Sequence, residues 1–339
     1  MRRPDADQGA VRGAAHVGDE VPSERAEGAR PLDIIGLGEP MLEFSQTTDT
    51  AGVGDHYLQG FGGDTSNAVI AAARQGAAVG YWTRLGQDVF GDRLMELWDH
   101  EGVEVGRVVR DPDAPTGIYF VTHGPAGHAF SYYRRDSAAS RMRPADVPVA
   151  AIASARVLHV SGISQAVSPS ACDAVATAIE AARAAGAAVS YDPNLRLKLW
   201  PLARARAVVL ETVAQCDVCL PSLEDATQLT GLGDPDAIVD DLLARGARVV
   251  ALKLGPDGAL VADGDERHRL AGHAVATVDA TGAGDTFDGA FLAEWVRGAS
   301  LADAARYANA VAALSTRGYG AVGPIPRRAE VEAWLAARG

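Results

Sequence analysis

The sequence is short of lysine and cysteine. Only Lys198 and Lys253 are lysines, and neither follows a glycine, which excludes the Gly-Lys pair of a Walker A loop. The HRD and DFG segments of a protein kinase are missing as well. Three cysteines in 339 residues are too few for a disulfide framework and favour a reducing compartment, so we expect a cytoplasmic protein.

Basic tracts and long apolar runs are also missing. The formal net charge is -13 and no tract of five basic residues occurs, which argues against nucleic acid or an anionic membrane surface as a partner. No apolar run reaches the length of a membrane span, and the N-terminus lacks the pattern of a signal peptide. Hydrophobic residues make up 47% of the chain, enough for a sizeable core in one large domain.

The order of apolar and polar segments predicts the architecture. Residues 1–30 have almost no large apolar side chain, which predicts a disordered N-terminal extension. From Asp33 on, strands alternate with helices, a pattern typical of a mostly parallel sheet covered on both faces, with the site at the carboxyl ends of its strands. The segments at about 39–60 and 114–135 read instead as hairpins, which we expect to form a small β lid. We expect the domain to span 31–328, with a C-terminal helix at 329–339.

The segment VDATGAGDTF places three small residues and a carboxylate at the start of a helix. Gly282, Ala283 and Gly284 leave backbone N–H groups open to an anion, and the dipole of the following helix points to the same place. Asp285 would accept a proton from a substrate hydroxyl, or orient it, while the N–H groups hold a transferring phosphoryl group. At a helix N-terminus we expect a lowered pKa for Asp285. The alternative is an ordinary glycine turn capped by Asp285.

Two other classes of protein would also use glycine turns. A nicotinamide-dependent oxidoreductase needs GxGxxG between a strand and a helix, with an acidic residue about 20 positions on. Neither GLGEP nor GFGGD supplies that pattern. A sugar-nucleotide sensor that binds without turnover would be expected to have lost Asp285 or the glycine corner, which is the turn formed by Gly282, Ala283 and Gly284. Both are present.

Two motifs taken together resemble one family. GFGGDTSN near the N-terminus and DATGAGDTFDGAF near the C-terminus are similar to the paired motifs of the ribokinase-like, or PfkB-type, carbohydrate kinases, and the similarity extends from residue 33 to about 328. The resemblance implies an α/β fold, a ribokinase-like three-layer sandwich with a mostly parallel central sheet and a small β-sheet lid. It also implies ATP as phosphoryl donor, Mg²⁺ as its charge partner, and a homo-oligomer formed through the lid.

The same resemblance implies roles for particular residues. It makes Asp285 the catalytic base and the small residues before it the anion hole. The positions that match its nucleotide-binding residues are Asn194, Arg196, Ser222, Lys253, Gly255, Gly258, Gly282, Gly284 and Asn309. Ser222 and Asp225 stand where the family has Asn-x-x-Glu, so Asp225 would hold Mg²⁺ indirectly. Asp279 and Thr281 match a monovalent-cation site, which would take K⁺.

Within the family, TGIYF, SYYRRDSAAS and DPNLRLKLW are most similar to kinases of 2-keto-3-deoxygluconate. A bidentate guanidinium distinguishes the carboxylate of such a sugar acid from a neutral sugar. The implied contacts to the sugar acid are Gly63, Asp64, Tyr119, Tyr132, Arg134, Arg196 and Asp285. We expect 2-keto-3-deoxygluconate to be converted to its 6-phospho form, and the alternative is a kinase for a neutral sugar such as fructose or ribose.

Each of these sugar contacts also has a structural alternative. Tyr119 and Tyr132 would serve equally as alternating core residues of a hairpin, and Arg134 as a solvated surface charge. Asp64 would either bind sugar hydroxyls or cap the helix that we expect to begin at Thr65.

Overall fold

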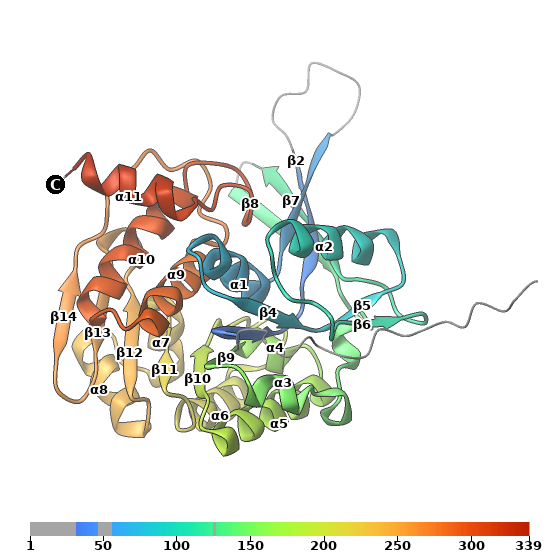
Figure 1. Ribbon diagram of the computed structural model, residues 1–339, viewed down its shortest axis with the longest axis horizontal. Coiled ribbons are helices and arrows are strands. Elements are labelled where there is room, and N and C mark those ends of the chain that lie inside the picture. The colour runs from blue at the N-terminus through green and yellow to red at the C-terminus, as the bar shows by residue number, and fades with distance from the viewer. Residues whose placement is uncertain (1–31, 47–55, 125–126, 339) are drawn as a thin grey trace, which may run out of the picture. The chain divides into compact units, whose positions relative to one another are not determined.

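The computed structural model describes residues 32–46, 56–124 and 127–338. The extension expected at 1–30 and part of the first lid segment lie outside these ranges. Within them, the larger sheet has eight strands, which in spatial order are β14 (Arg267–Leu270), β13 (Ala259–Ala262), β12 (Val249–Lys253), β11 (Val218–Cys219), β10 (Ala188–Asp192), β9 (Val157–Ser161), β1 (Ile34–Leu37) and β4 (Val79–Trp82). The pairs from β12 to β4 are parallel, and β13 and β14 add an antiparallel edge (Figure 1). The fold class is confirmed.

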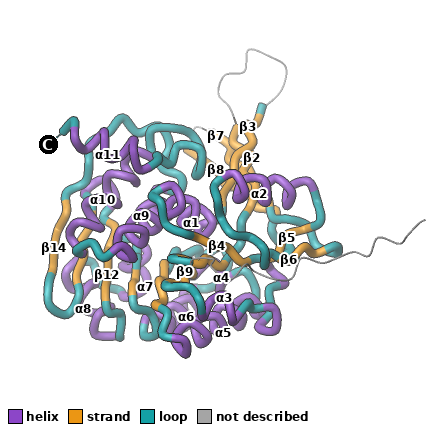
Figure 2. The backbone as a smooth tube through the Cα atoms, viewed as in Figure 1, coloured by secondary structure: helices purple, strands orange, loops and turns teal. Residues whose placement is uncertain are grey.

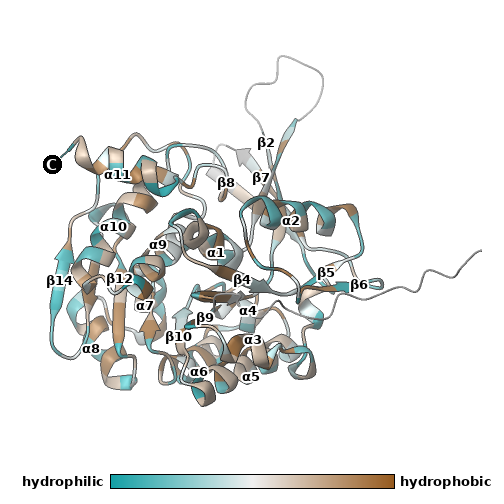
Figure 3. Ribbon diagram, in the orientation of Figure 1, coloured by the Kyte–Doolittle hydropathy of each residue, from teal (hydrophilic) through white to brown (hydrophobic). Residues whose placement is uncertain are grey.

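Helices cover both faces of this sheet because neighbouring residues of a strand point to opposite sides. Ile34 belongs to one buried cluster and Ile35 to the other. The helices packed on the Ile35 side are α3 (Val149–Ala153), α4 (Gly162–Ala166), α5 (Pro169–Ala185), α6 (Leu202–Val213), α7 (Leu223–Thr230) and α8 (Pro235–Arg245). Those on the Ile34 side are α1 (Asp64–Arg74), α2 (Val89–His100), α9 (Ala283–Arg297), α10 (Leu301–Ser315) and α11 (Arg328–Ala336). The parallel strands are therefore apolar on both faces, whereas β14 at the edge is hydrophilic (Figure 3).

The strand order reverses at β1, and this reversal locates the site. After β1 the chain adds β4 on one side, and it then returns to add β9, β10, β11 and β12 on the other side. Ligands of open α/β sheets bind where the order reverses, at the carboxyl ends of the strands. Glu39 follows β1 and Asp192 ends β10, so both side chains belong to this edge.

The lid is a second sheet, as expected. Its strands in spatial order are β3 (Tyr57–Gly62), β2 (Met41–Gln46), β7 (Ile118–Gly124) and β8 (Gly127–Tyr133). The outer pairs are antiparallel, and the central pair of β2 and β7 is parallel. Figure 2 shows these strands gathered beside α2, and α2 contacts β2.

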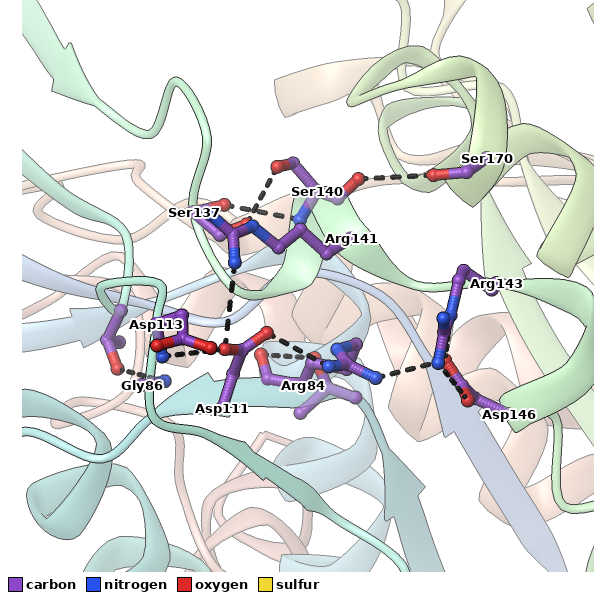
Figure 4. A network of polar contacts seen from close by, with 12 residues as sticks. Arg84, Gly86, Asp111, Asp113, Ser137, Ser140, Arg141, Arg143, Asp146 and Ser170 are labelled. Atoms are coloured by element: carbon purple, nitrogen blue, oxygen red, sulfur yellow. Dashed lines mark hydrogen bonds and ion pairs between the residues drawn. The ribbon is translucent and has the colours of Figure 1, made fainter.

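A polar network holds the segment that follows the lid. Arg84 on β5 (Arg84–Gly86) donates to Asp111 on β6 (Val109–Asp111) at 2.9 Å and to Asp146 at 3.0 Å. Arg141 pairs with the same Asp111, at 3.7 Å (Figure 4). Ser137 belongs to this network and also donates to Glu39 Oε1 at 2.5 Å. The network therefore connects the end of the lid to the carboxyl end of β1.

Among the described residues, every helix is too short or too polar to span a lipid bilayer.

Candidate active site

The glycine corner forms the first turn of α9. Gly282 caps this helix in the left-handed conformation, with φ of 73°, and a Cβ at that position would lie only 2.8 Å from the Cβ of Ala321. The N–H of Thr286 closes the first helical hydrogen bond, to Gly282 O at 2.8 Å. Glycine is therefore required here both by the backbone conformation and by the neighbouring loop.

The amides of the corner are not all available to an anion. The Ala283 N–H donates to Ala280 O at 3.2 Å within the turn. In the described part of the chain, the N–H groups of Gly284 and Asp285 have no backbone acceptor, as expected of the first turn of a helix. The predicted anion hole thus has its free amides at Gly284 and Asp285.

Asp285 is held by a side chain from a distant segment. Asn67 on α1 donates from Nδ2 to Asp285 Oδ2 at 2.8 Å. The structure brings these residues together because α1 and α9 pack against each other on one face of the main sheet.

The lowered pKa expected for Asp285 is wrong. Burial and the nearby charge of Asp64 raise its pKa to about 7, and Asp192 adds to this effect. The Asn67 hydrogen bond and the charge of Lys253 act in the opposite direction and are outweighed. Desolvation among carboxylates therefore dominates over the favourable position at a helix N-terminus. A carboxylate with a pKa near 7 is a better general base than an unperturbed aspartate.

Asp64 does not cap α1. Gly63 occupies the N-cap position, and the helix begins at Asp64 itself with no side-chain cap. The Asp64 carboxylate is buried, with one oxygen 3.5 Å from Asn194 Nδ2. Within the described residues, Asp64 Oδ1 and Asn67 Oδ1 are buried and accept no hydrogen bond. Two unsatisfied acceptors beside Asp285 suit the hydroxyl donors of a sugar.

Lys253, predicted to bind nucleotide, is held by two carboxylates. Its Nζ lies 3.1 Å from Asp192 Oδ2, and 2.8 and 3.0 Å from the two oxygens of Asp288. Asp288 is on α9, one turn after Asp285, and Asp192 ends β10. These ion pairs connect the start of α9 to the sheet.

Two buried carboxylates, one on the lid strand β2 and one after β1, pair with residues of the lid segment. Tyr119 is 5% exposed and its hydroxyl donates to Glu43 Oε2 at 2.5 Å, so Tyr119 is both a buried residue and part of a polar contact. Arg134 is not a solvated surface charge, because its side chain is 11% exposed and forms an ion pair with the fully buried Glu39. Tyr132 is 40% exposed, and its ring lies beside that of Tyr119, with centroids 5.6 Å apart.

Arg196 and Asp225 follow β10 and β11, at the carboxyl ends of these strands. Arg196 is exposed, and its Nη1 donates to Leu195 O at 2.9 Å. Ser222 caps α7 and accepts from the N–H of Asp225. Burial, followed by the charge of Asp192, raises the pKa of Asp225, and Arg196 lowers it. A hard divalent cation would offset this repulsion, so the carboxylates fit Mg²⁺, although no cluster of three metal-ligating side chains occurs among the described residues.

The other residues predicted to bind the nucleotide either follow β12 or lie on α10. Gly255 begins a short turn that ends before Gly258. Asn309 is buried on α10, with Nδ2 3.4 Å from Leu270 O at the end of β14. Asp279 accepts from the Thr281 hydroxyl at 2.7 Å, which fixes the loop before the glycine corner.

Several residues of the site were not predicted. Asn67 is part of the GFGGDTSN motif, three residues after Asp64. In a helix, residues three positions apart lie on the same face, and this spacing could have indicated that Asn67 belongs to the site. Asp192 stands in DPNLR, directly after a predicted strand, which could also have indicated it. The partnership of Glu39 with Arg134 and of Asp288 with Lys253 had no sequence signal, because each pair joins distant segments.

Comparison with known proteins agrees with this geometry. The model of the pfkB family of carbohydrate kinases matches residues 33–328. A 2-dehydro-3-deoxygluconokinase of Bacillus subtilis is 33% identical over 91% of this chain and 96% of its own length. Fructokinase-1 of Oryza sativa is also 33% identical, over 88% of this chain and 96% of its own. A ribokinase II of Escherichia coli, solved in complex with ATP and Mg²⁺, has a TM-score of 0.82 and 25% identity, covering 90% of this chain and 99% of its own.

These likenesses define a phosphotransferase that acts on sugars. The chain belongs to the pfkB family of carbohydrate kinases.

Proposed function

We propose that this carbohydrate kinase transfers the γ-phosphoryl group of ATP to 2-keto-3-deoxygluconate and forms its 6-phospho derivative. The observation that carries the proposal is Asp285, a carboxylate with a pKa of about 7 next to the open amides of a helix N-terminus. In this arrangement Asp285 accepts the proton of the attacking sugar hydroxyl as the new oxygen–phosphorus bond forms and the bond to ADP breaks. The amides of Gly284 and Asp285 bind the phosphoryl oxygens.

The sugar would be oriented by the unsatisfied acceptors. Asp64 Oδ1 and Asn67 Oδ1 would accept hydroxyl hydrogens, and the Tyr119 and Tyr132 rings would cover the sugar from the lid. When bound, Mg²⁺ would be held through water by Asp225 and would offset charge on the phosphates. Asn194, Arg196, Ser222, Gly255, Gly258 and Asn309 would surround the nucleotide.

Two arginines support a sugar acid. Arg134, which follows the lid strand β8, and Arg196, which follows β10, could each place a guanidinium against the sugar carboxylate. The similarity to the 2-dehydro-3-deoxygluconokinase of Bacillus subtilis points the same way.

A neutral sugar such as fructose is the second candidate substrate. Glu39 compensates the charge of Arg134, and Glu43 and Asp64 add further acidic groups around the site. With these acidic groups nearby, Arg134 attracts the carboxylate of a sugar acid less strongly than an arginine without them would. The equal identity to a fructokinase supports this candidate.

ADP release distinguishes the candidates. The purified chain is assayed with 2-keto-3-deoxygluconate, fructose and ribose side by side, in the wild type and in the Arg196→Ala and Asp285→Asn variants. We expect 2-keto-3-deoxygluconate to have the highest kcat/KM, and Arg196→Ala to harm its use far more than the use of fructose. Asp285→Asn should lower kcat by about three orders of magnitude with every sugar. A higher kcat/KM for fructose in the wild type would reject the sugar acid and keep the kinase.

K⁺ and self-association are further proposals. K⁺ would bind beside the loop that Asp279 and Thr281 form, and replacing K⁺ by tetramethylammonium in the assay should then lower kcat.

The lid exposes Leu58 (56%) and Tyr133 (65%), which a second copy of the chain would cover. Sedimentation equilibrium should therefore give a dimer, and Tyr133→Ser should weaken it.

A further inference from the structure

The two faces of the lid sheet have different surroundings. On one face Phe44 stacks on Phe120 and lies edge-on to Phe90 of α2. Successive residues of a strand point to opposite faces, so Glu43 and Tyr119 belong to the other face. They are direct neighbours in the parallel pair of β2 and β7. Glu43 is therefore a carboxylate on the face of the lid that is turned away from α2.

Glu43 is buried in mostly apolar company. Its side chain belongs to a residue that is only 3% exposed, and Met41, Tyr119 and Val121 form a buried cluster on the same face. Burial raises the pKa of Glu43, the hydrogen bond from Tyr119 opposes this shift, and the charge of Asp279 adds to it. Burying a carboxylate in such surroundings costs free energy. Packing alone therefore does not explain why an acid stands at this position.

Two observations place the Tyr119 hydroxyl beside the site. A Cβ built on Gly62 would overlap this hydroxyl, and Gly62 is the last residue of β3, just before α1. The pKa of Tyr119 is raised by burial and by the charge of Glu43, and the charge of Asp285 adds to this shift. The hydroxyl thus lies close enough to the start of α1 and to Asp285 to meet a sugar bound between them.

The direction of one hydrogen bond decides what Tyr119 offers to such a sugar. Its hydroxyl donates to Glu43 Oε2 at 2.5 Å. A phenol has one hydrogen, so this bond uses its only donor and leaves its oxygen as an acceptor. Among the described residues, Asp64 Oδ1 and Asn67 Oδ1 are likewise buried acceptors without a donor. All three groups therefore suit the hydroxyl hydrogens of a sugar.

We propose that Glu43 is a positioning residue that holds the hydroxyl hydrogen of Tyr119 away from the bound sugar, so that Tyr119 Oη accepts a hydroxyl hydrogen from it. This inference rests on the proposed function, which places a sugar beside Asp285. It goes further by naming the residue that sets the direction of a hydrogen bond in the site. A carboxylate or keto oxygen has no hydrogen to donate, so that part of a sugar acid would lie away from Tyr119. The competing explanation is that the pair only fastens β2 to β7.

Analogues of the sugar separate these explanations. Isothermal titration without nucleotide gives the dissociation constants, for whichever of 2-keto-3-deoxygluconate, fructose and ribose binds the wild type most tightly. In each analogue fluorine replaces one hydroxyl, which removes the hydrogen that the hydroxyl donates. We expect one analogue to bind the wild type about fivefold more weakly than the parent sugar, but to bind Tyr119→Phe with nearly the affinity of the parent. That analogue identifies the hydroxyl that donates to Tyr119.

Glu43→Met then tests the positioning role. The variant removes the acceptor, so the Tyr119 hydroxyl can turn its hydrogen toward the sugar. For the analogue identified with Tyr119→Phe, the ratio of its dissociation constant to that of the parent should fall from about fivefold to below about twofold. The ratios of the other analogues should not change. Met41→Leu, on the same strand and face, is the matched control and should leave every ratio unchanged. If Glu43→Met weakens the parent and all analogues by one common factor, the pair only fastens the strands and the proposal is refuted.

A double variant covers the case in which Glu43→Met alone does not fold. Glu43→Met/Tyr119→Phe removes both partners of the hydrogen bond, so neither is left buried and unpaired. It should match Tyr119→Phe for every analogue, because Glu43 acts only through the tyrosine. A further change in any ratio would mean that Glu43 contacts the sugar itself, and would refute the positioning role.

The proposed function fails separately. A wild type that releases no ADP with any of the three sugars would reject it, while the titrations, which need no nucleotide, still test Glu43. A wild type that releases ADP, but has no analogue whose ratio depends on both Tyr119 and Glu43, would reject only the role of Glu43. A wild type that binds none of the three sugars would reject both.

Discussion

Replacing Asp285 by asparagine should stabilise the folded protein, and increasingly so as the pH rises. The pKa of Asp285 rises from an ordinary 3.8 to about 7 on folding, mainly through burial and the charge of Asp64. A pKa raised by about 3 units corresponds to about 4 kcal/mol against the ionised form at pH values above 7. An asparagine at 285 has no charge to desolvate, and its side-chain oxygen can still accept from Asn67 Nδ2.

The sign of the pH dependence follows from proton binding. The folded state holds the Asp285 proton more tightly than the unfolded state, so the wild type loses stability as the pH rises from about 4 to about 7. Between about pH 5.5 and about pH 8.5 this loss amounts to roughly 2 kcal/mol. The difference between Asp285→Asn and the wild type should therefore grow by about 2 kcal/mol over that range, or roughly 3 °C in Tm.

Urea denaturation of both proteins at the two pH values measures this difference. Asp173→Asn on the exposed side of α5 is the matched control, and it should change the free energy of unfolding by less than about 0.5 kcal/mol at either pH. A stability difference for Asp285→Asn that is the same at both pH values would refute the reasoning, because it would mean that Asp285 is ionised in the folded protein throughout.

Three further outcomes follow from the geometry. With saturating substrates, kcat should fall about tenfold for each pH unit below about 7, as Asp285 becomes protonated; a pH profile that is flat down to about 5.5 would contradict this. Gly289→Ala should lower the free energy of unfolding by about 3 kcal/mol, measured by urea denaturation, because its Cβ would lie 2.0 Å from Ala68 O. Glu39→Gln leaves the buried Arg134 without its carboxylate and should cost about 3 kcal/mol. In a thermal-shift assay of that variant, 2-keto-3-deoxygluconate should restore more of the Tm than fructose does.

Much of the architecture could be predicted because it depends on local patterns. Alternating strands and helices predicted the parallel sheet, and the interruption at 114–135 predicted the separate lid. The antiparallel edge formed by β13 and β14 was not predicted, because Arg267–Leu270 is polar and short and its pairing depends on a turn.

The chemistry of the site was predicted less completely than its position. VDATGAGDTF located Asp285, but the direction of its pKa shift depends on Asp64 and Asp192, which come from other elements. Arg134 was identified as a candidate without its partner Glu39, because the ion pair joins the end of β1 to the end of β8. Contacts between distant segments decide these properties, and a local pattern carries no information about them.

The hydrogen bond from Asn67 to Asp285 joins positions 218 residues apart. The site consequently does not exist in any N-terminal part of the chain that stops short of α9, so a growing polypeptide on the ribosome has no phosphotransferase activity until nearly all of it has been made. Contacts of such long range also slow folding, since a large loop must close before they form. Activity regained after dilution from denaturant should therefore appear late, with the docking of α9 onto α1, and not with the earlier formation of helices.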